Sequence, residues 1–396
     1  MKKTFTILVL LSAICGLSSI TYSQSTWTQK ANFGGSGRYG AVGFSVDTKG
    51  YIGTGLDASA YKKDMWEYDP SQDTWTQKAD FPGAARRHTV AFTIGTKAYV
   101  GLGYDGTDTT YYKDFWEYDP SSGLWSQITD FPGTARFGAV AFSIGTKGYV
   151  GTGKDSASMT KDFYEWDQGS NTWTQKANFP GAARTRAVGF SVDTTGFIGL
   201  GYSSTYYKDF YEYNPSSDTW LQKTDFGGTA RKSAVAFSIG IKGYAGTGND
   251  GADKKDFWEY DPSLNSWTQM ADFGGVVRHC ASAFAIGTKG YIGTGIGSSY
   301  KNDFWEYDPT IVSINELSSK EIKISVYPNP SSGKFTLSSE IISGKIVIYN
   351  VMGEIIFQST IVNQQSTIDL SSKPKGIYFV KIYDSEKIYS EKVVIQ

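Results

Sequence analysis

Short runs of alternating apolar and polar residues fill positions 26–309, and the same order of runs recurs along this part of the chain. One copy reads AVAFSI at 139–144, GYVGTG at 148–153, FYEWD at 163–167 and TWTQK at 172–176. Clusters of Gly, Pro, Asn and Ser separate the runs, and none has a convincing 3.6-residue apolar period. The pattern therefore predicts an all-β fold with four short strands per copy, named here strands A to D.

A tryptophan in strand D marks each copy of the repeat. These residues are Trp27, Trp75, Trp125, Trp173, Trp220 and Trp267, at intervals of 48, 50, 48, 47 and 47 residues. A period near 50 residues with four strands per unit predicts a six-bladed β-propeller, whose radial packing covers sheets that cannot bury both faces alone. Strand A alternates small residues (Ala139, Ala141) with bulky ones (Val140, Phe142), so we expect it to be innermost.

The two ends of the repeat array are incomplete in complementary ways. Trp27 lies in a strand D that has no strand C before it, whereas 303–308 (DFWEYD) is a strand C that no strand D follows. We predict that these segments pair, complete the sixth blade and close the ring without an open edge. The predicted propeller spans residues 24–309.

These repeats resemble kelch repeats over roughly residues 26–309. The chain departs from the usual kelch pattern at the end of strand B, where Gly151-Thr152-Gly153 and its equivalents replace a glycine pair. The resemblance implies a kelch-type propeller, a class that includes both binding modules and enzymes such as galactose oxidase.

The N-terminus has the features of an export signal. Lys2 and Lys3 precede an apolar run at 5–17, and Thr21-Tyr22-Ser23 supplies small residues before Gln24, so we predict a signal peptide over residues 1–23. The run is too short and too interrupted for a membrane anchor. No later stretch predicts a membrane span after signal cleavage.

Beyond the repeats, residues 310–323 predict a linker and residues 324–396 a small β-sandwich of short alternating segments. The segment contains VYPNP at 326–330, IYNVMG at 348–353, GIYFVK at 376–381 and KVVI at 392–395. These motifs resemble the C-terminal sorting domain of the type IX secretion system of Gram-negative bacteria. The resemblance implies that the secretion machinery is a partner through residues 324–396, and that the protein is secreted or displayed at the cell surface.

Charge and cysteine content exclude some classes of function. The formal net charge is −1, from 38 basic and 39 acidic residues, which argues against nucleic-acid binding driven by bulk charge. After removal of the signal peptide, Cys280 is the single cysteine, so we expect no internal disulfide.

An arginine recurs where strand D leads into the next strand A. The six are Arg38, Arg86, Arg136, Arg184, Arg231 and Arg278. Each blade also has a glutamate in strand C: Glu67, Glu117, Glu165, Glu212, Glu259 and Glu306. Because buried charges are normally paired, we predict one structural arginine–glutamate pair per blade rather than an anion-binding ring.

The candidate site is where the copies differ. The A–B and C–D turns are nearly uniform, whereas the D–A and B–C loops on the opposite face vary and are rich in Tyr, Ser, Gly and Asp, a composition suited to recognition. The predicted ligand-binding residues are Tyr39, Arg87, His88, Phe137, Arg186, Lys232, His279, Tyr104, Tyr111 and Tyr206. Tyrosine rings offer a flat apolar face with a hydroxyl, which suits a sugar or a peptide.

We predict a module that binds a glycan or an extracellular protein through this face, rather than an enzyme. The first alternative is a mutarotase-like or epimerase-like enzyme at the same mouth, although no spacing selects an acid–base pair. The second is a structural surface protein. The residues His88, His279 and Cys280 include types found in the copper site of galactose oxidase, but the histidines lie on blades 2 and 6, so we predict no metal and no cofactor.

Overall fold

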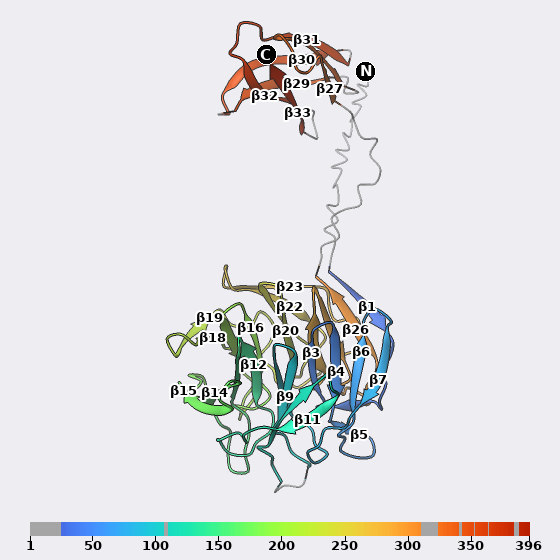
Figure 1. The fold of residues 1–396 in the computed structure, drawn as a ribbon, viewed down its shortest axis with the longest axis vertical. Helices are drawn as coiled ribbons and strands as arrows, with labels where there is room; N and C mark the ends of the chain where they lie inside the picture. Colours follow the sequence, from blue (N-terminus) through green and yellow to red (C-terminus); the bar gives the residue numbers. More distant parts are fainter. Residues whose placement is uncertain are drawn as a thin grey trace, which may run out of the picture. The chain divides into compact units, whose positions relative to one another are not determined.

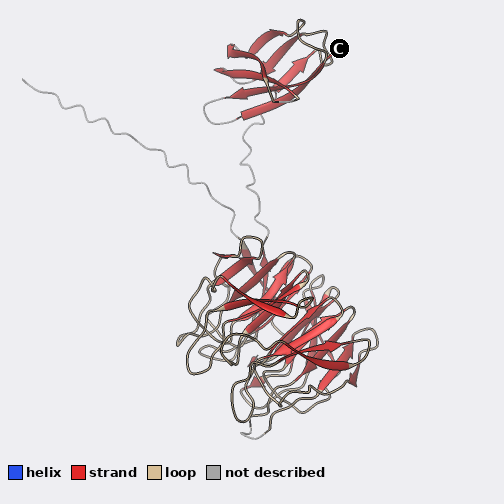
Figure 2. Cartoon of the chain, turned by 90° about the vertical axis from the view of Figure 1, so that its left-hand side faces the viewer, coloured by secondary structure: helices blue, strands red, loops and turns tan. Residues whose placement is uncertain are grey.

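The computed structural model describes residues 25–106, 110–309, 324–339, 343–351, 353–362, 364–383 and 388–396. The predicted signal peptide at 1–23 and linker at 310–323 lie outside these residues. The chain divides into two compact units, Met1–Val312 and Ser313–Gln396. All regular structure in the described part is β-strand, joined by turns and loops (Figure 2).

The first unit contains six antiparallel four-stranded sheets, the blades. Blade 1 has β3 (Val42–Val46), β4 (Lys49–Gly53), β6 (Met65–Asp69) and β7 (Thr74–Lys78) as strands A to D. Blade 2 has β8 (Val90–Ile94), β9 (Lys97–Gly101), β10 (Phe115–Asp119) and β11 (Leu124–Gln127), and blade 3 has β12 (Val140–Ile144), β13 (Lys147–Gly151), β14 (Phe163–Asp167) and β15 (Thr172–Lys176).

The remaining blades repeat this order. Blade 4 has β16 (Val188–Val192), β17 (Thr195–Gly199), β18 (Phe210–Asn214) and β19 (Thr219–Lys223), and blade 5 has β20 (Val235–Ile239), β21 (Lys242–Gly246), β22 (Phe257–Asp261) and β23 (Ser266–Gln269). Blade 6 has β24 (Ser282–Ile286), β25 (Lys289–Gly293) and β26 (Phe304–Asp308), with β1 (Thr26–Lys30) as its outer strand. Two short strands, β2 (Arg38–Tyr39) and β5 (Leu56–Asp57), pair outside the blades.

The ring closes as predicted. Strand β1 pairs antiparallel with β26, with Trp27 opposite Tyr307, and the two strands lie side by side in Figure 1. The inner strands contact one another in the order β3, β8, β12, β16, β20, β24 and back to β3. Every blade therefore has two neighbours, and the two ends of the propeller chain share one blade.

Strand A lines the axis, and its bulky face fits the next blade. Along β12 the alternate residues Val140, Phe142 and Ile144 are buried. The ring of Phe142 lies where a Cβ on Gly196 of blade 4 would stand, at 2.3 Å. Glycine at this position of strand B therefore lets the phenyl ring of one blade press against the backbone of the next.

The predicted arginine–glutamate pairs are wrong. In each blade the arginine binds the aspartate that immediately precedes strand C: Asp64, Asp114, Asp162, Asp209, Asp256 and Asp303. Arg136, for example, donates from Nη2 to Asp162 Oδ2 at 2.8 Å and from Nη1 to the Thr152 carbonyl at 3.1 Å. The D–A loop lies at the end of the blade where strand C begins, so its arginine meets the first carboxylate of that strand.

The glutamates serve a different contact, in the middle of strand C. Glu165 accepts a hydrogen bond from the Tyr149 hydroxyl of strand B at 2.7 Å, and burial followed by this carboxylate raises the pKa of Tyr149. The same tyrosine–glutamate bond is present in blades 1, 2, 5 and 6. In blade 4 strand B carries Phe197 instead, and Glu212 pairs with Lys223 at 3.0 Å.

The second unit is a seven-stranded sheet in the order β27-β28-β31-β30-β29-β32-β33. Its strands are β27 (Ile324–Tyr327), β28 (Lys334–Ser339), β29 (Ser343–Asn350), β30 (Ile355–Val362), β31 (Gln365–Asp369), β32 (Gly376–Tyr383) and β33 (Ile388–Ile395). The edge strands β27 and β33 contact each other, so the sheet wraps around a core that includes Phe335, Leu337, Ile348 and Val380. This arrangement is the small sandwich that the alternating segments predict.

Candidate functional site

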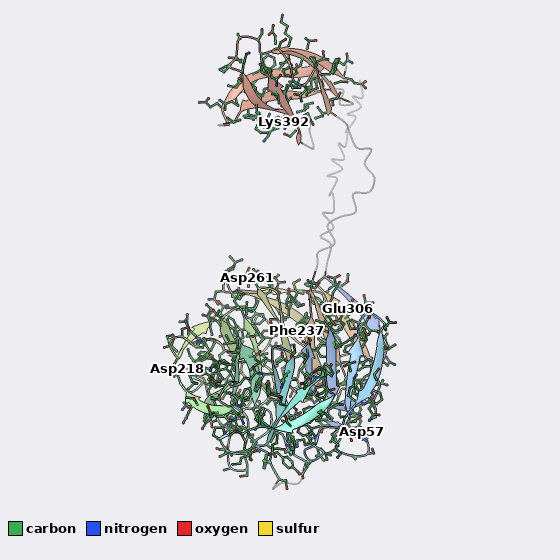
Figure 3. All side chains as sticks on the ribbon, in the orientation of Figure 1. Asp57, Asp218, Phe237, Asp261, Glu306 and Lys392 are labelled. Atoms are coloured by element: carbon green, nitrogen blue, oxygen red, sulfur yellow. The ribbon has the colours of Figure 1, made fainter. Side chains whose placement is uncertain are left out.

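The propeller presents two unlike faces. The A–B and C–D turns form one, and the D–A and B–C loops form the other; Figure 3 labels Asp261 at a C–D turn near one end of the propeller and Asp57 in a B–C loop near the opposite end. Thr26 of β1 is opposite Asp308 of β26, at the position of a C–D turn. The first strand of the propeller therefore begins, and its last strand ends, at the uniform face, and the variable face carries loops alone.

A ring of six backbone segments surrounds the axis on the variable face. We call it the mouth ring; its members are Gly40, His88, Gly138, Arg186, Ser233 and Cys280, one per blade, and all have φ between +51° and +62°. Each N–H donates to the carbonyl of the member in the preceding blade, for example from His88 to Gly40 at 2.7 Å and from Cys280 to Ser233 at 3.0 Å. Gly40 in turn donates to Cys280 at 3.0 Å, so the circle is closed.

Outside the mouth ring, each blade has a short radial row of bridged residues. The residue before the mouth-ring member pairs with the start of the B–C loop, which pairs with a residue near the end of that loop. The rows are Tyr39–Leu56–Tyr61, Arg87–Tyr104–Tyr111, Phe137–Lys154–Met159, Thr185–Tyr202–Tyr206, Lys232–Asn249–Asp253 and His279–Ile296–Tyr300. The variable positions of the sequence therefore form one continuous surface around the mouth.

Blades 1 to 3 bring six of the predicted residues together. The Arg87 guanidinium lies 4.8 Å from the ring centroids of both Tyr39 and Tyr104, and it hydrogen-bonds the Tyr104 hydroxyl. Phe137 packs against Tyr104 at 4.3 Å and against Tyr111 at 5.9 Å between centroids. These four aromatic rings and the Arg87 guanidinium form one packed group, which we call the aromatic shelf.

The sixth predicted residue in this group, His88, lies beneath the shelf. Its ring lies 5.8 Å from that of Phe137, and the side chain is buried. Burial, together with the charges of Arg186 and Arg87, lowers the pKa of His88 well below its usual value. The imidazole is therefore neutral at physiological pH.

Blades 4 and 5 contribute a second aromatic and cationic group. The ammonium group of Lys232 lies 4.5 Å from the Tyr202 ring centroid and 5.6 Å from that of Tyr206. Arg186 lies 5.7 Å from the Phe137 ring and so connects this group to the shelf. Burial first, and then the charge of Arg186, lowers the pKa of Lys232, as expected for two cations that share one site.

His279, the last predicted residue, stands in a different arrangement. Its Nδ1 lies 2.7 Å from Oδ1 of Asp253, which also accepts a hydrogen bond from Asn249 at 2.7 Å. A carboxylate that orients an imidazole is a familiar acid–base arrangement.

The charges on this face are unevenly compensated. The acidic side chains of the B–C loops have partners: Asp57 binds Lys62 at 2.8 Å, Asp250 binds Lys254 at 2.9 Å, and Asp155 accepts from Thr134 at 2.9 Å. In contrast, within the described part of the chain no carboxylate lies within 4.0 Å of the basic groups of Arg87, Arg186 or Lys232. The described ion pairs therefore leave three cationic groups at the inner rim, while Asp253 adds a carboxylate beside His279.

Sequence reasoning missed several residues of this surface. Tyr61, Tyr202 and Tyr300 lie in the radial rows beside predicted residues, and Tyr300 stacks on Tyr39 at 5.7 Å. Ser233 shares the mouth-ring position with His88 and Arg186. An alignment of the six copies position by position could have identified these residues. In such an alignment Ser233 is equivalent to His88, and Tyr202 is equivalent to Tyr104.

Below the mouth the channel is narrow and lined by small residues. The first layers carry Ala139, Ala141 and their equivalents, followed by Ser143 and its equivalents. This lining offers little chemistry, so the recognition surface is confined to the mouth and its rim. Among the described residues, no group of three or more His, Cys, Asp or Glu side chains is arranged to hold a metal ion.

The two units together define the class of protein: a six-bladed β-propeller joined to an export domain. Residues 325–396 match the family model of the secretion system C-terminal sorting domain, of the type IX system. The protein is therefore secreted or displayed at the cell surface, and its sorting domain interacts with the secretion machinery. In the described residues no helix is long and apolar enough to cross a membrane.

The propeller is similar to a solved structure described as "Structure of YjhT", a kelch-type propeller. The two chains are 14% identical, with a TM-score of 0.58, and the match covers 70% of this chain and 95% of YjhT. At this identity the likeness establishes a shared fold. A search of curated proteins found no match.

Proposed function

We propose that the protein is a binding module that recognises an extracellular glycan through its D–A and B–C loop face. The observation that carries the proposal is the surface around the mouth, where aromatic rings lie beside three cations: Tyr39 beside Arg87, Phe137 beside Arg186 and Tyr202 beside Lys232. Aromatic rings bind the apolar faces of sugars, and neighbouring cations and hydroxyls supply directional hydrogen bonds. An extracellular protein is the other ligand that this composition suits.

The position of the chain connections supports the same face. Thr26 and Asp308 lie at the A–B and C–D face, so the chain enters and leaves the blades away from the D–A and B–C loops. A module with its site on the other face would have these connections at the edge of the site.

A glycan array probed with the full chain tests the proposal. We expect Tyr111→Ala/Tyr206→Ala to lose most of the signal, because the change removes two rings from the radial rows. The matched control is Ile241→Ala/Leu264→Ala, which removes two exposed side chains from the turns of the opposite face and should leave binding unchanged. Loss of binding in the control but not in the tyrosine variant would contradict the proposal.

The protein arm of the test uses the same variants against secreted proteins of the producing cell. Binding that depends on the tyrosines would identify a protein ligand at the same face. If the protein binds neither glycans nor secreted proteins, the proposal is overturned in favour of a structural surface protein.

One observation favours an enzyme as the second candidate. The His279–Asp253 pair could move a proton on a sugar bound at the mouth, as a mutarotase or an epimerase requires. Exchange of anomers measured by NMR on a bound sugar tests this idea. Faster exchange that is lost in His279→Gln supports catalysis, and exchange at the rate without protein contradicts it.

A further inference from the structure

Four members of the mouth ring carry a side chain in a backbone conformation that is unfavourable for residues other than glycine. All six members have positive φ, which glycine adopts freely, and blades 1 and 3 use Gly40 and Gly138. Blades 2, 4, 5 and 6 place His88, Arg186, Ser233 and Cys280 in the same backbone conformation. Positive φ also occurs at a fixed position after strand B in every blade, for example at Thr152 and Leu200, so it does not by itself mark a ligand site. The mouth ring differs from that position because glycine fills it in two blades and four unlike side chains fill it in the others.

Unsatisfied polar atoms gather at the same place. Nine buried side-chain nitrogen or oxygen atoms in the described residues have no hydrogen-bond partner in the protein. Four of them lie in the mouth ring or directly beside it: Arg87 Nε, His88 Nε2, Arg186 Nε and Ser233 Oγ. His88 is 8% exposed and Ser233 6%, so water outside the channel does not account for them. Buried polar groups are normally hydrogen-bonded, so the partners of this cluster come from outside the protein chain, as water or as polar groups of a ligand.

These atoms surround a cavity. His88, Arg186, Ser233 and Cys280 line a space of about 120 Å³ at the channel mouth. One water molecule needs roughly 10–15 Å³ of such a space, so the cavity has room for a small polar group of a ligand. Arg186 Nε is a hydrogen-bond donor and the serine hydroxyl can donate, while Arg186 and nearby Lys232 bring positive charge.

We infer that the channel mouth is an oxyanion site, in which Arg186, Ser233 and His88 hold a carboxylate or a sulfate ester of the bound glycan. Arg186 supplies the charge and a donor, Ser233 a second donor, and His88 a neutral imidazole beside them. Lys232 precedes Ser233 in the chain and does not line the cavity, but its ammonium group, over the Tyr202 ring, adds positive charge to the rim outside it. The inference rests on the proposed function for the identity of the ligand as a glycan, but the oxyanion site itself does not depend on the aromatic rows.

Calorimetric titration of the full chain with four defined probes tests the inference. The probes are sodium glucuronate, glucose 6-sulfate, glucose and sodium sulfate. We expect one of the acidic sugars to bind about tenfold or more tightly than glucose, because charged hydrogen bonds are the strong ones. Glucuronate and glucose 6-sulfate separate a carboxylate from a sulfate ester, and sulfate alone measures what the anion contributes without the sugar.

The test variants are Arg186→Gly and Ser233→Gly, which recreate the residue that Gly40 and Gly138 already supply in this conformation. They therefore remove the side chain without straining the ring. We expect Arg186→Gly to weaken the acidic sugar about tenfold or more and Ser233→Gly several-fold. The control Lys49→Met removes one positive charge from the opposite face of the propeller, where Lys49 pairs with Asp69, and should change affinity little.

Each outcome decides the inference. If Lys49→Met weakens binding as much as Arg186→Gly, bulk charge explains the affinity and the site is overturned. If all four probes fail to bind while the array detects neutral glycans through the tyrosines, the oxyanion site is wrong and the proposed function stands. If an acidic sugar binds and Arg186→Gly abolishes binding while the tyrosine variant binds the array normally, the site stands and the aromatic face is wrong.

Discussion

Arg184 and Arg186 stand two residues apart at the entrance to the same blade, yet their surroundings are opposite. Arg184 is fully buried; it donates two hydrogen bonds to Asp209, one of them at 2.7 Å, and others to the carbonyls of Leu200 and Ala182, both at 2.9 Å. Arg186 is half-buried; no carboxylate of the described residues lies within 4.0 Å of its guanidinium, and its buried Nε has no hydrogen-bond partner there. The first side chain completes the blade, whereas the second is the one that we propose binds a ligand.

The contrast between these two arginines shows how residues that stabilise a repeat can be distinguished from residues that are available for binding. The arginine of the Arg184 type recurs in all six blades with its aspartate, its carbonyl and an aromatic ring beneath it. The Arg186 position is filled differently in every blade except the two that use glycine. A charge that carries its own partner in each copy stabilises the fold, and an unpartnered charge in one copy marks a site.

The largest expected effect is the loss of Arg184. Arg184→Ala should lower the free energy of unfolding by about 3–5 kcal/mol, because Asp209 and the Leu200 carbonyl lose their partner in a mostly buried place. Urea unfolding followed by tryptophan fluorescence measures this, since all 11 tryptophans lie in the propeller. An unchanged midpoint would show that the paired arginines are not structural.

Acid should destabilise the propeller through the same pairs. Burial alone raises the pKa of Asp64, Asp256 and Asp303, but hydrogen bonds and charge from their arginines outweigh it and the pKa is lowered overall. A lowered pKa contributes stability that is complete above the usual aspartate value and is lost as pH falls below it. Urea midpoints at pH 6, 4 and 3 should therefore decline, most steeply between the last two. Equal midpoints at pH 6 and pH 3 would contradict the pairing.

A smaller effect is expected inside the sheet. Tyr149→Phe should cost about 1–2 kcal/mol, because it removes a hydrogen bond to Glu165 that blade 4 lacks naturally. The reverse change, Phe197→Tyr, creates the missing hydroxyl next to Glu212 and is the matched control. Stability unaffected by Tyr149→Phe would show that these hydroxyls are dispensable.

The smallest expected effect on stability is at the mouth. Arg186→Gly should leave the unfolding free energy unchanged or raise it by about 1 kcal/mol, because glycine adopts positive φ without strain. A loss as large as that of Arg184→Ala would mean that Arg186 belongs to the structural set and would remove the contrast between the two.

The blade count, the innermost strand and the closure by β1 could all be predicted from the sequence, because each depends on patterns that repeat six times. The partner of the recurring arginine could not. Asp162 and Glu165 are both in every copy, and only the place where the D–A loop meets the start of strand C decides between them.

For the site, the variable face and most of its aromatic residues followed from comparison of the copies. The mouth ring did not, because it is made by hydrogen bonds between blades and by positive φ at positions where the sequence has glycine in only two of six copies. The unpartnered atoms of His88, Arg186 and Ser233 meet through that ring, from three blades that are far apart in the sequence.

The central claim is tested most directly by the affinity of the Arg186→Gly variant for an acidic sugar. Calorimetry measures this affinity, and urea unfolding of the same variant measures its stability. The account predicts that stability is kept while glucuronate or glucose 6-sulfate binds about tenfold more weakly than to the unaltered chain. Affinity equal to that of the unaltered chain, or no binding of either sugar to that chain, would contradict it.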